Sequence, residues 1–321
     1  MLKRLDGFII GLLLMIVLAW FIPELANGGG FLSLEVIADI GISLIFFFYG
    51  LKLSPRQMKE GLSNYRLHIL VQCTTFLLFP VLVLLAYPFI KGEDGQLLWL
   101  AMFFLAALPS TVSSSVVMVV LAKGNVAGAI FNASISGLIG IVVTPLWMGL
   151  FLAGGDASFD FTGVMLSLIL KILLPVVFGL FFHRYWGIWA KQHSKKLALF
   201  DKAIILIIVY KSFAHSFEAG IFQSVSIGEL SVLFIAVVVL FILIYFIVLL
   251  LATRFNFNQA DKITALFCGS KKSLVHGSVM SKVLFEGMAG QGLFLLPIML
   301  YHALQLIVIS FIAQKMAKRN E

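Results

Sequence analysis

The chain has 321 residues, of which 61% are hydrophobic and only 12% are charged. Soluble domains carry about 25% charged residues, so this composition excludes an ordinary soluble protein and predicts an integral membrane protein. The net charge of +8 would suggest a nucleic-acid partner in a soluble protein. In a membrane protein the basic residues instead mark the cytoplasmic loops. We therefore expect the lipid bilayer as a partner and no nucleic acid.

Ten apolar windows follow one another along the chain, and each is a candidate transmembrane helix. They cover residues 8–22, 34–51, 67–90, 97–120, 126–152, 162–182, 203–222, 230–252, 263–284 and 292–313. The seventh is the weakest, because Lys211 and His215 interrupt it. The first has the basic flank of a signal peptide, but no small-residue cleavage site follows, and we expect a retained span. The sequence predicts an all-α polytopic membrane protein with ten transmembrane helices.

The loop charges predict the orientation. If both termini lie on one side, that side collects 17 of the 23 basic residues, whereas the opposite loops are mainly acidic. By the positive-inside rule both termini are cytoplasmic, and the chain is a multi-pass protein of the inner membrane. Five spans in each half give the halves opposite orientations, which predicts two inverted repeats at 1–154 and 160–321 within a single transporter unit.

A polar cluster interrupts the fourth window. Pro109 removes a main-chain donor and breaks the helix. Hydroxyls that follow it can satisfy the freed main-chain groups or bind an ion. The alternative is a proline kink whose serines bond back to their own helix. The candidate site residues here are Pro109, Ser110, Thr111, Ser113, Ser114 and Ser115.

The ninth window carries the second interruption. Gly269 and Ser270 are expected to break the helix, and Ser273 to cap the next one. Lysines near the middle of the hydrocarbon core cost about 3 kcal/mol or more each unless they are compensated, which marks a functional site. For His276, a hydrogen bond between helices and a proton-carrying role both stay open. The candidates are Gly269, Ser270, Lys271, Lys272, Ser273 and His276.

Other polar residues support these two interruptions. Small and polar residues recur every four positions in the fifth window, at Gly128, Asn132, Ser136 and Gly140, so this span is expected to pack against the broken helices. Asn132 and Ser134 join the candidate site, with Gln72, Ser136, Tyr301 and His302 in support. Lys171 and Lys211 are further intramembrane charges, which either snorkel or pair with a substrate anion.

Five segments together carry a specific resemblance over essentially the whole chain. They are FFFYGLKLSP at 46–55, PSTVSSSVV at 109–117, GNVAGAIFNASISGLIGIVVTPL at 124–146, FCGSKKSLVHGSVMSKVLF at 267–285 and YHALQL at 301–306. These resemble the bile acid:sodium symporter family, in its SBF-like branch. The resemblance implies ten spans, with a panel domain of spans 1, 2, 6 and 7 and a core domain of the others. It also implies that broken spans four and nine cross, and that transport proceeds by alternating access with substrate bound behind the crossover.

One departure from the family pattern concerns sodium. In the sodium-coupled branch, the sequence at the ninth-span break resembles the pattern Glu-Val-Gly-x-Gln-Asn. The resemblance implies that the Glu and the Gln of this pattern bind sodium. Aligned on Gly269, this chain has Phe267 for the Glu, Lys271 for the Gln and Lys272 for the Asn. The span-five hydroxyls of that branch align with Ala129 and Ala133. Sodium coupling therefore does not carry over directly from the resemblance.

The residues contain no nucleotide loop, no zinc-protease motif and no serine elbow, so we expect a transporter and not an enzyme. Our hypothesis is a secondary transporter for a small organic anion, in which Lys271 or Lys272 replaces a sodium ion. Burial favours the neutral amine, so coupling would be to protons or absent. One alternative is ordinary sodium symport, with sodium at Ser113, Ser114, Ser115 and Asn132. Another is a non-transporting regulator of calcium homeostasis. No cofactor is expected beyond a coupling sodium ion or proton, and the sequence leaves protein partners unknown.

Overall fold

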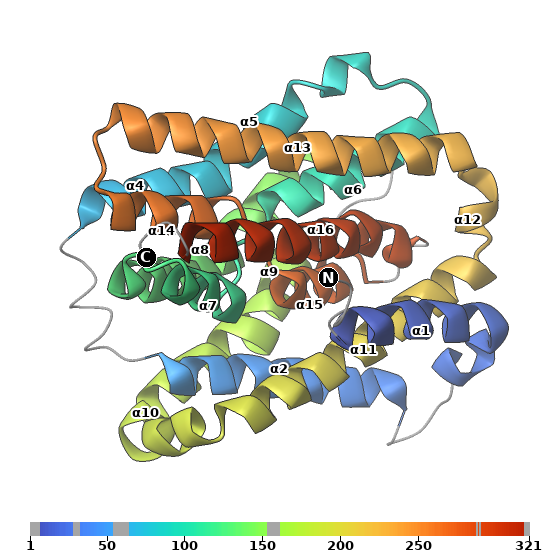
Figure 1. Ribbon diagram of the computed structural model, residues 1–321. Coiled ribbons are helices and arrows are strands. Elements are labelled where there is room, and N and C mark those ends of the chain that lie inside the picture. Colours follow the sequence, from blue (N-terminus) through green and yellow to red (C-terminus); the bar gives the residue numbers. More distant parts are fainter. Residues whose placement is uncertain are drawn as a thin grey trace. The chain divides into compact units, whose positions relative to one another are not determined.

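The computed structural model describes residues 7–27, 33–53, 64–152, 161–286, 288 and 290–317. The regular structure in these residues is helical throughout, and they contain no strand (Figure 1). Six of the described helices are long and apolar enough to cross a membrane, at Leu34–Lys52, Tyr65–Phe89, Val126–Leu152, Leu166–Gln192, Ile227–Arg254 and Gln291–Ala317. Helix α1 (Gly7–Phe21) is apolar but shorter. The chain is therefore a multi-pass membrane protein, as its composition predicts.

Two of the expected spans are each divided into two helices. The window at 97–120 becomes α6 (Glu93–Ala107) and α7 (Ser113–Leu121). The window at 263–284 becomes α14 (Gln259–Gly269) and α15 (Leu274–Leu284). The helix breaks expected near Pro109 and Ser270 are thus present. Each half is shorter than the roughly 20 residues that a complete span needs.

The described residues separate into two compact units, and both halves of the sequence contribute to each. Unit 1 comprises the described parts of Met1–Ser54, Ala157–Ser226 and Gly277–Leu295. Its elements are α1, η1 (Pro23–Asn27), α2 (Leu34–Lys52), α9 (Phe161–Leu168), η4 (Ile169–Leu173), α10 (Leu174–Gln192), α11 (Ser194–Glu218), α12 (Ile221–Ser224), most of α15 and the start of α16 (Gln291–Ala317).

Unit 2 comprises the described parts of Pro55–Asp156, Ile227–His276 and Leu296–Glu321. Its elements are α4 (Tyr65–Cys73), η2 (Thr74–Leu78), α5 (Phe79–Leu84), η3 (Tyr87–Phe89), α6, α7, α8 (Val126–Leu152), α13 (Ile227–Arg254), α14, the first turn of α15 and the rest of α16. Both broken spans thus have their interruptions in this unit.

In unit 1, helices α2 and α10 touch through their backbones. A Cβ atom added to Gly179 would lie 2.1 Å from the carbonyl oxygen of Phe47, and one added to Gly50 would lie 2.2 Å from that of Val176. No side chain fits at either position. The two glycines therefore permit a close helix–helix approach of the kind that small residues favour in membranes.

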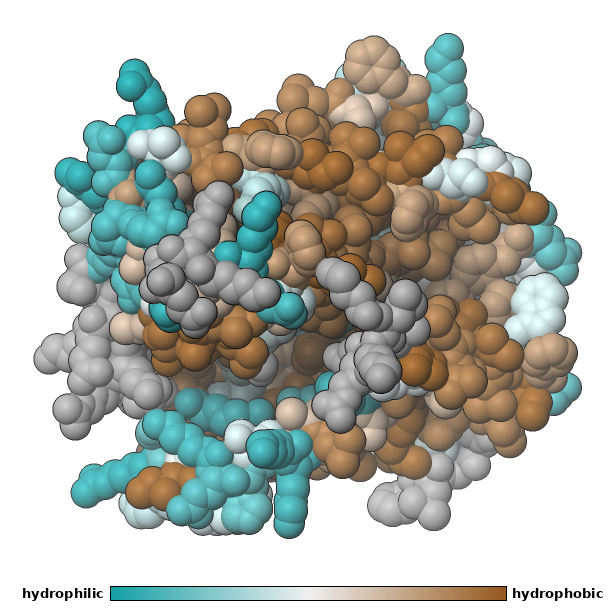
Figure 2. All heavy atoms as spheres, viewed as in Figure 1, coloured by the Kyte–Doolittle hydropathy of each residue, from teal (hydrophilic) through white to brown (hydrophobic). Residues whose placement is uncertain are grey.

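In unit 2, a carboxylate joins three helix starts. The Asp261 side chain accepts hydrogen bonds from the amide groups of Asn64 at 2.8 Å, Asn125 at 2.7 Å and Asn258 at 2.9 Å. These residues lie at the beginnings of α4, α8 and α14. The outer surface of the unit is apolar along α13, where Val232, Phe246 and Leu250 are exposed (Figure 2). Such a surface suits contact with lipid.

Candidate functional site

The break between α6 and α7 frees main-chain groups that neighbouring residues satisfy. The Ser110 N–H donates to the Ser136 hydroxyl at 3.0 Å, and the Thr144 hydroxyl donates to the carbonyl of Ala107 at 2.8 Å. Because the Ser110 N–H is engaged with Ser136, the carbonyl of Ala106, four residues earlier, has lost its usual helical donor. The break therefore leaves carbonyl oxygens available to other groups.

The hydroxyls after Pro109 bond to one another and to the other interrupted span. The Thr111 and Ser115 hydroxyl oxygens lie 2.7 Å apart, and the Ser114 hydroxyl donates to that of Thr111 at 3.0 Å. Ser115 also donates to the carbonyl of Phe267 on α14 at 3.1 Å. A simple kink with serines bonded to their own helix does not account for the Ser115 contact with Phe267. The Ser113 side chain lies outside the described residues.

The interruptions of spans four and nine contact each other directly within unit 2. The Ser273 N–H donates to the carbonyl of Pro109 at 2.9 Å. The Ser110 hydroxyl donates to the carbonyl of Cys268 at 2.6 Å. Each interruption thus supplies partners for main-chain groups that the other leaves free, which is how irregular backbone is stabilised at membrane depth.

The ammonium group of Lys272 is the centre of this arrangement. Its Nζ donates to the carbonyl oxygens of Thr75 at 2.8 Å, Ala106 at 2.6 Å and Leu108 at 2.7 Å. It also lies 4.0 Å from the centroid of the Phe79 ring, within the range of a cation–π interaction. Only 1% of Lys272 is exposed. A protonated lysine has three N–H donors, and here each has a carbonyl acceptor.

The sequence around Pro80 explains why the Thr75 carbonyl is available. Residues 74–78 form a π-helical turn, in which the Phe79 N–H donates to the carbonyl of Thr74. The donor for Thr75 would then come from residue 80, but proline has no N–H. The π turn and the proline together leave this carbonyl for the Lys272 ammonium group.

Lys271 lies beside Lys272 but has a different environment. It is fully buried, and its Nζ donates to the carbonyl of Ser114 at 3.0 Å. One carbonyl acceptor serves it, compared with three for Lys272. The structure therefore separates two lysines that the sequence leaves equivalent.

Helix α16 holds the ninth-span break in place. The Gln305 side chain accepts from the Lys272 N–H and donates to the Lys272 carbonyl, both at 2.9 Å. The Tyr301 hydroxyl donates to the carbonyl of Ser270 at 2.7 Å, and His302 contacts Gln305 at 3.0 Å. Sequence reasoning named Tyr301 and His302 but missed Gln305, although it lies one helical turn after Tyr301.

The small and polar stripe of α8 packs against the fourth-span break, as expected. A Cβ added to Gly140 would lie 2.8 Å from the ring of Pro109. Asn132 is buried, and its carbonyl and side-chain oxygens accept from the Gln72 amide at 3.2 Å and 3.1 Å. Ser134 is buried in the same helix. These residues support the crossover as packing partners.

His276 contacts the residue that caps its helix. The His276 N–H donates to the Ser273 hydroxyl at 3.3 Å, so the expected cap of α15 is present. The ring Nδ1 lies 2.9 Å from the same hydroxyl. This contact lies at the first turn of α15 and joins the ring to the capping residue.

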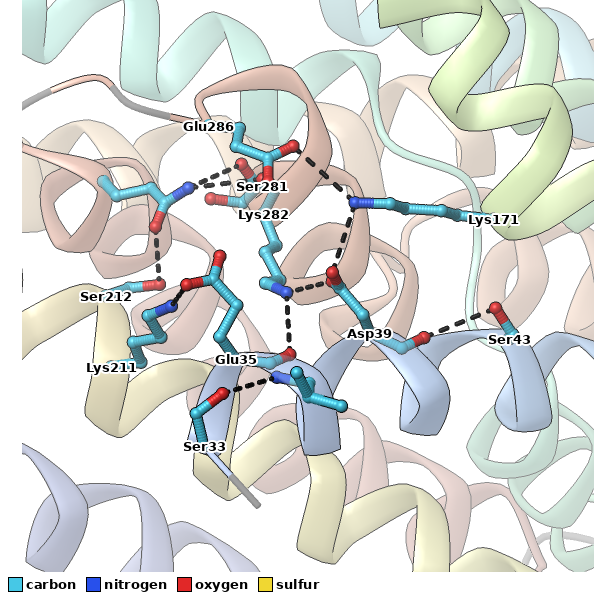
Figure 3. A network of polar contacts seen from close by, with 12 residues as sticks. Ser33, Glu35, Asp39, Ser43, Lys171, Lys211, Ser212, Ser281, Lys282 and Glu286 are labelled. Carbon is cyan, nitrogen blue, oxygen red and sulfur yellow. Dashed lines mark hydrogen bonds and ion pairs between the residues drawn. The ribbon is translucent and has the colours of Figure 1, made fainter. Parts of the chain in front are cut away.

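Unit 1 contains a network of alternating charges that the sequence analysis did not predict (Figure 3). Lys211 pairs with Glu35 at 2.7 Å. Lys282 pairs with Asp39 and also donates to the main-chain carbonyl of Glu35. Lys171 lies 3.5 Å from Asp39. Glu35 and Asp39 are one helical turn apart on α2. This spacing of two acidic residues in an apolar window is the signal in the sequence from which an acidic partner for the lysines could have been predicted.

The network ends at Glu286, which lies 3.7 Å from Lys171. Lys171 and Lys211 therefore pair with carboxylates of the protein and not only with solvent.

A cavity of about 480 Å³ lies beside this network. Its lining residues are Glu35, Ala38, Ile208, Lys211, Ser212, His215, Ala219, Lys282, Glu286, Met288 and Gln291, and all belong to unit 1.

Comparison with known proteins identifies the family. The SBF-like CPA transporter family matches residues 6–318. The chain belongs to this family. It is similar to "Putative symporter YfeH" of Escherichia coli K12, with 35% identity over 99% of this chain and 95% of the relative. It is also similar to "Sodium/bile acid cotransporter 7-B" of Xenopus laevis, with 31% identity over 95% and 90%.

The match covers nearly the whole of each chain, so both units and both helix breaks belong to the region shared with this family. The family is one of transporters and not of enzymes. Among the described residues no cluster of three or more His, Cys, Asp or Glu side chains is arranged to hold a metal.

Proposed function

We propose that the chain is a secondary active transporter that moves a small organic anion across the inner membrane by alternating access. In this proposal ten helices form two inverted repeats, at 1–154 and 160–321, with both termini cytoplasmic. Family membership supports the transport activity. The division into two units supports the panel and core domains in part, since unit 1 contains the helices of expected spans 1, 2, 6 and 7 together with most of α15 and the start of α16.

The observation that carries the mechanistic proposal is the set of three carbonyl oxygens around the Lys272 Nζ, at 2.6–2.8 Å. Main-chain carbonyls are typical ligands for hard cations. Here a covalently tethered ammonium group takes that role. In the resemblance described above, the same position is an asparagine in the sodium-coupled branch. The residues of the ninth-span break therefore do not fit a sodium ion as they stand.

A tethered cation changes what drives transport. Lys272 has all three of its donors engaged, so it serves as a fixed positive charge that stabilises the helix ends. Lys271, with one carbonyl acceptor at 3.0 Å, is the residue that we propose gains and loses a proton during the cycle. With one acceptor, Lys271 loses fewer hydrogen bonds on deprotonation than Lys272 would lose. Transport would then be linked to protons and independent of sodium at this position.

Uptake into proteoliposomes tests this proposal. Organic anions, including taurocholate, are first screened with the purified protein for thermal stabilisation, and the stabilising anions are then used as uptake substrates. We expect uptake to persist when sodium is replaced by choline and to respond to an imposed pH gradient. Uptake that requires a sodium gradient and ignores pH would contradict it.

One observation favours sodium symport as a second candidate. The side-chain oxygen of Gln72 is buried without a hydrogen-bond partner among the described residues, and the Gln72 amide contacts Asn132. An unused oxygen at this place suits a cation bound with the help of Ser114 and Asn132. Sodium-dependent thermal stabilisation that disappears in Ser114→Ala or Asn132→Ala would favour this candidate. Absence of flux under every gradient would instead favour a non-transporting regulator.

A further inference from the structure

The charge network of unit 1 is balanced, with three lysines and three acidic residues. Its members come from α2, η4, α11, α15 and the residues after α15 (Figure 3). In two of its pairs, Lys211–Glu35 and Lys282–Asp39, the lysine is more buried than the carboxylate.

Lys211 and Lys282 are more buried than the carboxylates with which they pair, whereas Lys171 and Asp39 are similarly exposed, at 26% and 32%. The side chain of Lys211 is 12% exposed and that of its partner Glu35 is 52% exposed. The side chain of Lys282 is 7% exposed and that of its partner Asp39 is 32% exposed. An exposed carboxylate loses little when it turns into solvent, because half-exposed ion pairs are worth about 1 kcal/mol or less. A buried ammonium group that loses its partner needs another anion.

The cavity beside the network is where such an anion could reach these lysines. Lys211 and Lys282 both line it, and Ser212 and Gln291 add neutral polar groups. The Ser212 hydroxyl and the Gln291 amide oxygen are 3.3 Å apart, which fixes both side chains. Ala38, Ile208 and Met288 form apolar walls. The carboxylates of Glu35 and Glu286 also line the cavity. When they turn toward solvent, the cations, polar groups and apolar walls that stay match an amphipathic organic anion.

We propose that this cavity binds the carboxylate or sulfonate group of an organic anion, with Lys211 and Lys282 as its ligands. Glu35 acts as an internal competitor that holds Lys211 while the cavity is empty. The anion displaces the Glu35 carboxylate, which turns toward solvent, and its apolar part lies against Ile208 and Met288. This inference rests on the proposed anion transport and adds a binding site in unit 1, separate from the crossover in unit 2.

Binding measurements on the full-length protein in nanodiscs test the site. The probes are benzenesulfonate and taurocholate, with neutral benzenesulfonamide for comparison, and the readout is the Kd from calorimetry. We expect Lys211→Gln to weaken sulfonate binding about tenfold or more, the value of a charge-assisted hydrogen bond. Glu35→Gln should tighten it about two- to fivefold, because the competitor is removed. Benzenesulfonamide should not distinguish these variants.

A second ion pair in unit 1 provides the matched control. Lys52 and Asp201 lie 3.8 Å apart and neither lines the cavity. Lys52→Gln and Asp201→Asn should leave sulfonate binding unchanged. If Glu35→Gln weakens binding as much as Lys211→Gln does, the pair is structural and the proposal is wrong. Absence of sulfonate binding to the unmodified protein also overturns it.

A charge exchange addresses the possibility that Lys211→Gln fails to fold. The double variant Glu35→Lys with Lys211→Glu keeps the ion pair but places a carboxylate inside the cavity. We expect it to keep its melting temperature and to lose sulfonate binding. Recovery of binding in this variant would refute the site. Uptake measurements separate the two proposals. Sulfonate binding by an unmodified protein that shows no flux would contradict the transport function but not the cavity. Flux that Lys211→Gln leaves unchanged would contradict the role of the cavity but not the transport function.

Discussion

The Nζ of Lys272 lies 2.8 Å from the carbonyl oxygen of Thr75, although 197 positions separate these residues in the chain. The contact depends on a π turn in one span and on a helix break in another. Neither feature has a main-chain donor to offer the Thr75 carbonyl. The lysine therefore completes the hydrogen bonding of two irregular segments at once.

Removal of the Lys272 ammonium group should destabilise the protein. In Lys272→Met three buried carbonyls lose their donor, and each unsatisfied group costs about 1–3 kcal/mol. We expect a drop of several degrees in the melting temperature of the detergent-purified protein. Lys91→Met, in an exposed loop position of the same unit, is the control and should melt like the unmodified protein. Equal melting temperatures for the two variants would contradict a structural role for the ammonium group.

The variant Lys272→Asn should restore a response to sodium. It removes the tethered cation and leaves the carbonyl oxygens of Thr75, Ala106 and Leu108 free for a metal ion. We expect sodium to raise the melting temperature of this variant, choline to have no effect, and the unmodified protein to respond to neither. A sodium response of equal size in the unmodified protein would show that Lys272 does not replace the ion.

Substitution of Pro80 should weaken the Lys272 contact without removing any charge. In Pro80→Ala residue 80 gains an N–H that competes for the Thr75 carbonyl, and the turn at 74–78 can become regular. We expect uptake to fall while the melting temperature stays the same or rises. Pro145→Ala tests another proline inside a helix of unit 2 and should not share this effect. Unchanged uptake in Pro80→Ala would rule out the competition.

Loss of the Ser110 hydroxyl should loosen the crossover. Ser110→Ala leaves the Cys268 carbonyl without the donor that now lies 2.6 Å away, at a cost of about 1–2 kcal/mol. Thermal unfolding should detect this loss. Ser231→Ala removes an exposed hydroxyl that bonds only to its own helix and serves as the control. Similar small effects for both serines would mean that the Ser110 bond contributes little.

A methyl group at the contact of α2 and α10 should separate the helices. In Gly179→Ala the new Cβ would lie 2.1 Å from the Phe47 carbonyl oxygen, and overpacking of this kind costs about 1–3 kcal/mol. Gly7→Ala, with no atom within 4 Å of the added Cβ, should be neutral. The melting temperatures of the two variants provide the comparison, and a neutral Gly179→Ala would show that the approach of α2 and α10 relaxes without cost.

Local chemistry in the sequence was enough to predict the helix breaks. Pro109 removes a donor wherever it lies in a helix, and the polar run at 269–273 interrupts an otherwise apolar span. The cap at Ser273 followed from the same local rules. The charge network of unit 1 could not be predicted in this way, because Glu35 and Lys211 lie in different helices and their pairing depends on packing.

Apolar length and proline chemistry are local properties, so the sequence is enough to predict a helical membrane protein with two interrupted spans. The packing of distant segments is needed to show which lysine has the full set of carbonyl acceptors. Lys271 and Lys272 are adjacent and chemically identical, and their difference arises from oxygens of α6, η2 and α7 that the chain brings to them from more than 150 residues away. The positions of these carbonyl oxygens around each lysine therefore depend on the packing of the whole unit.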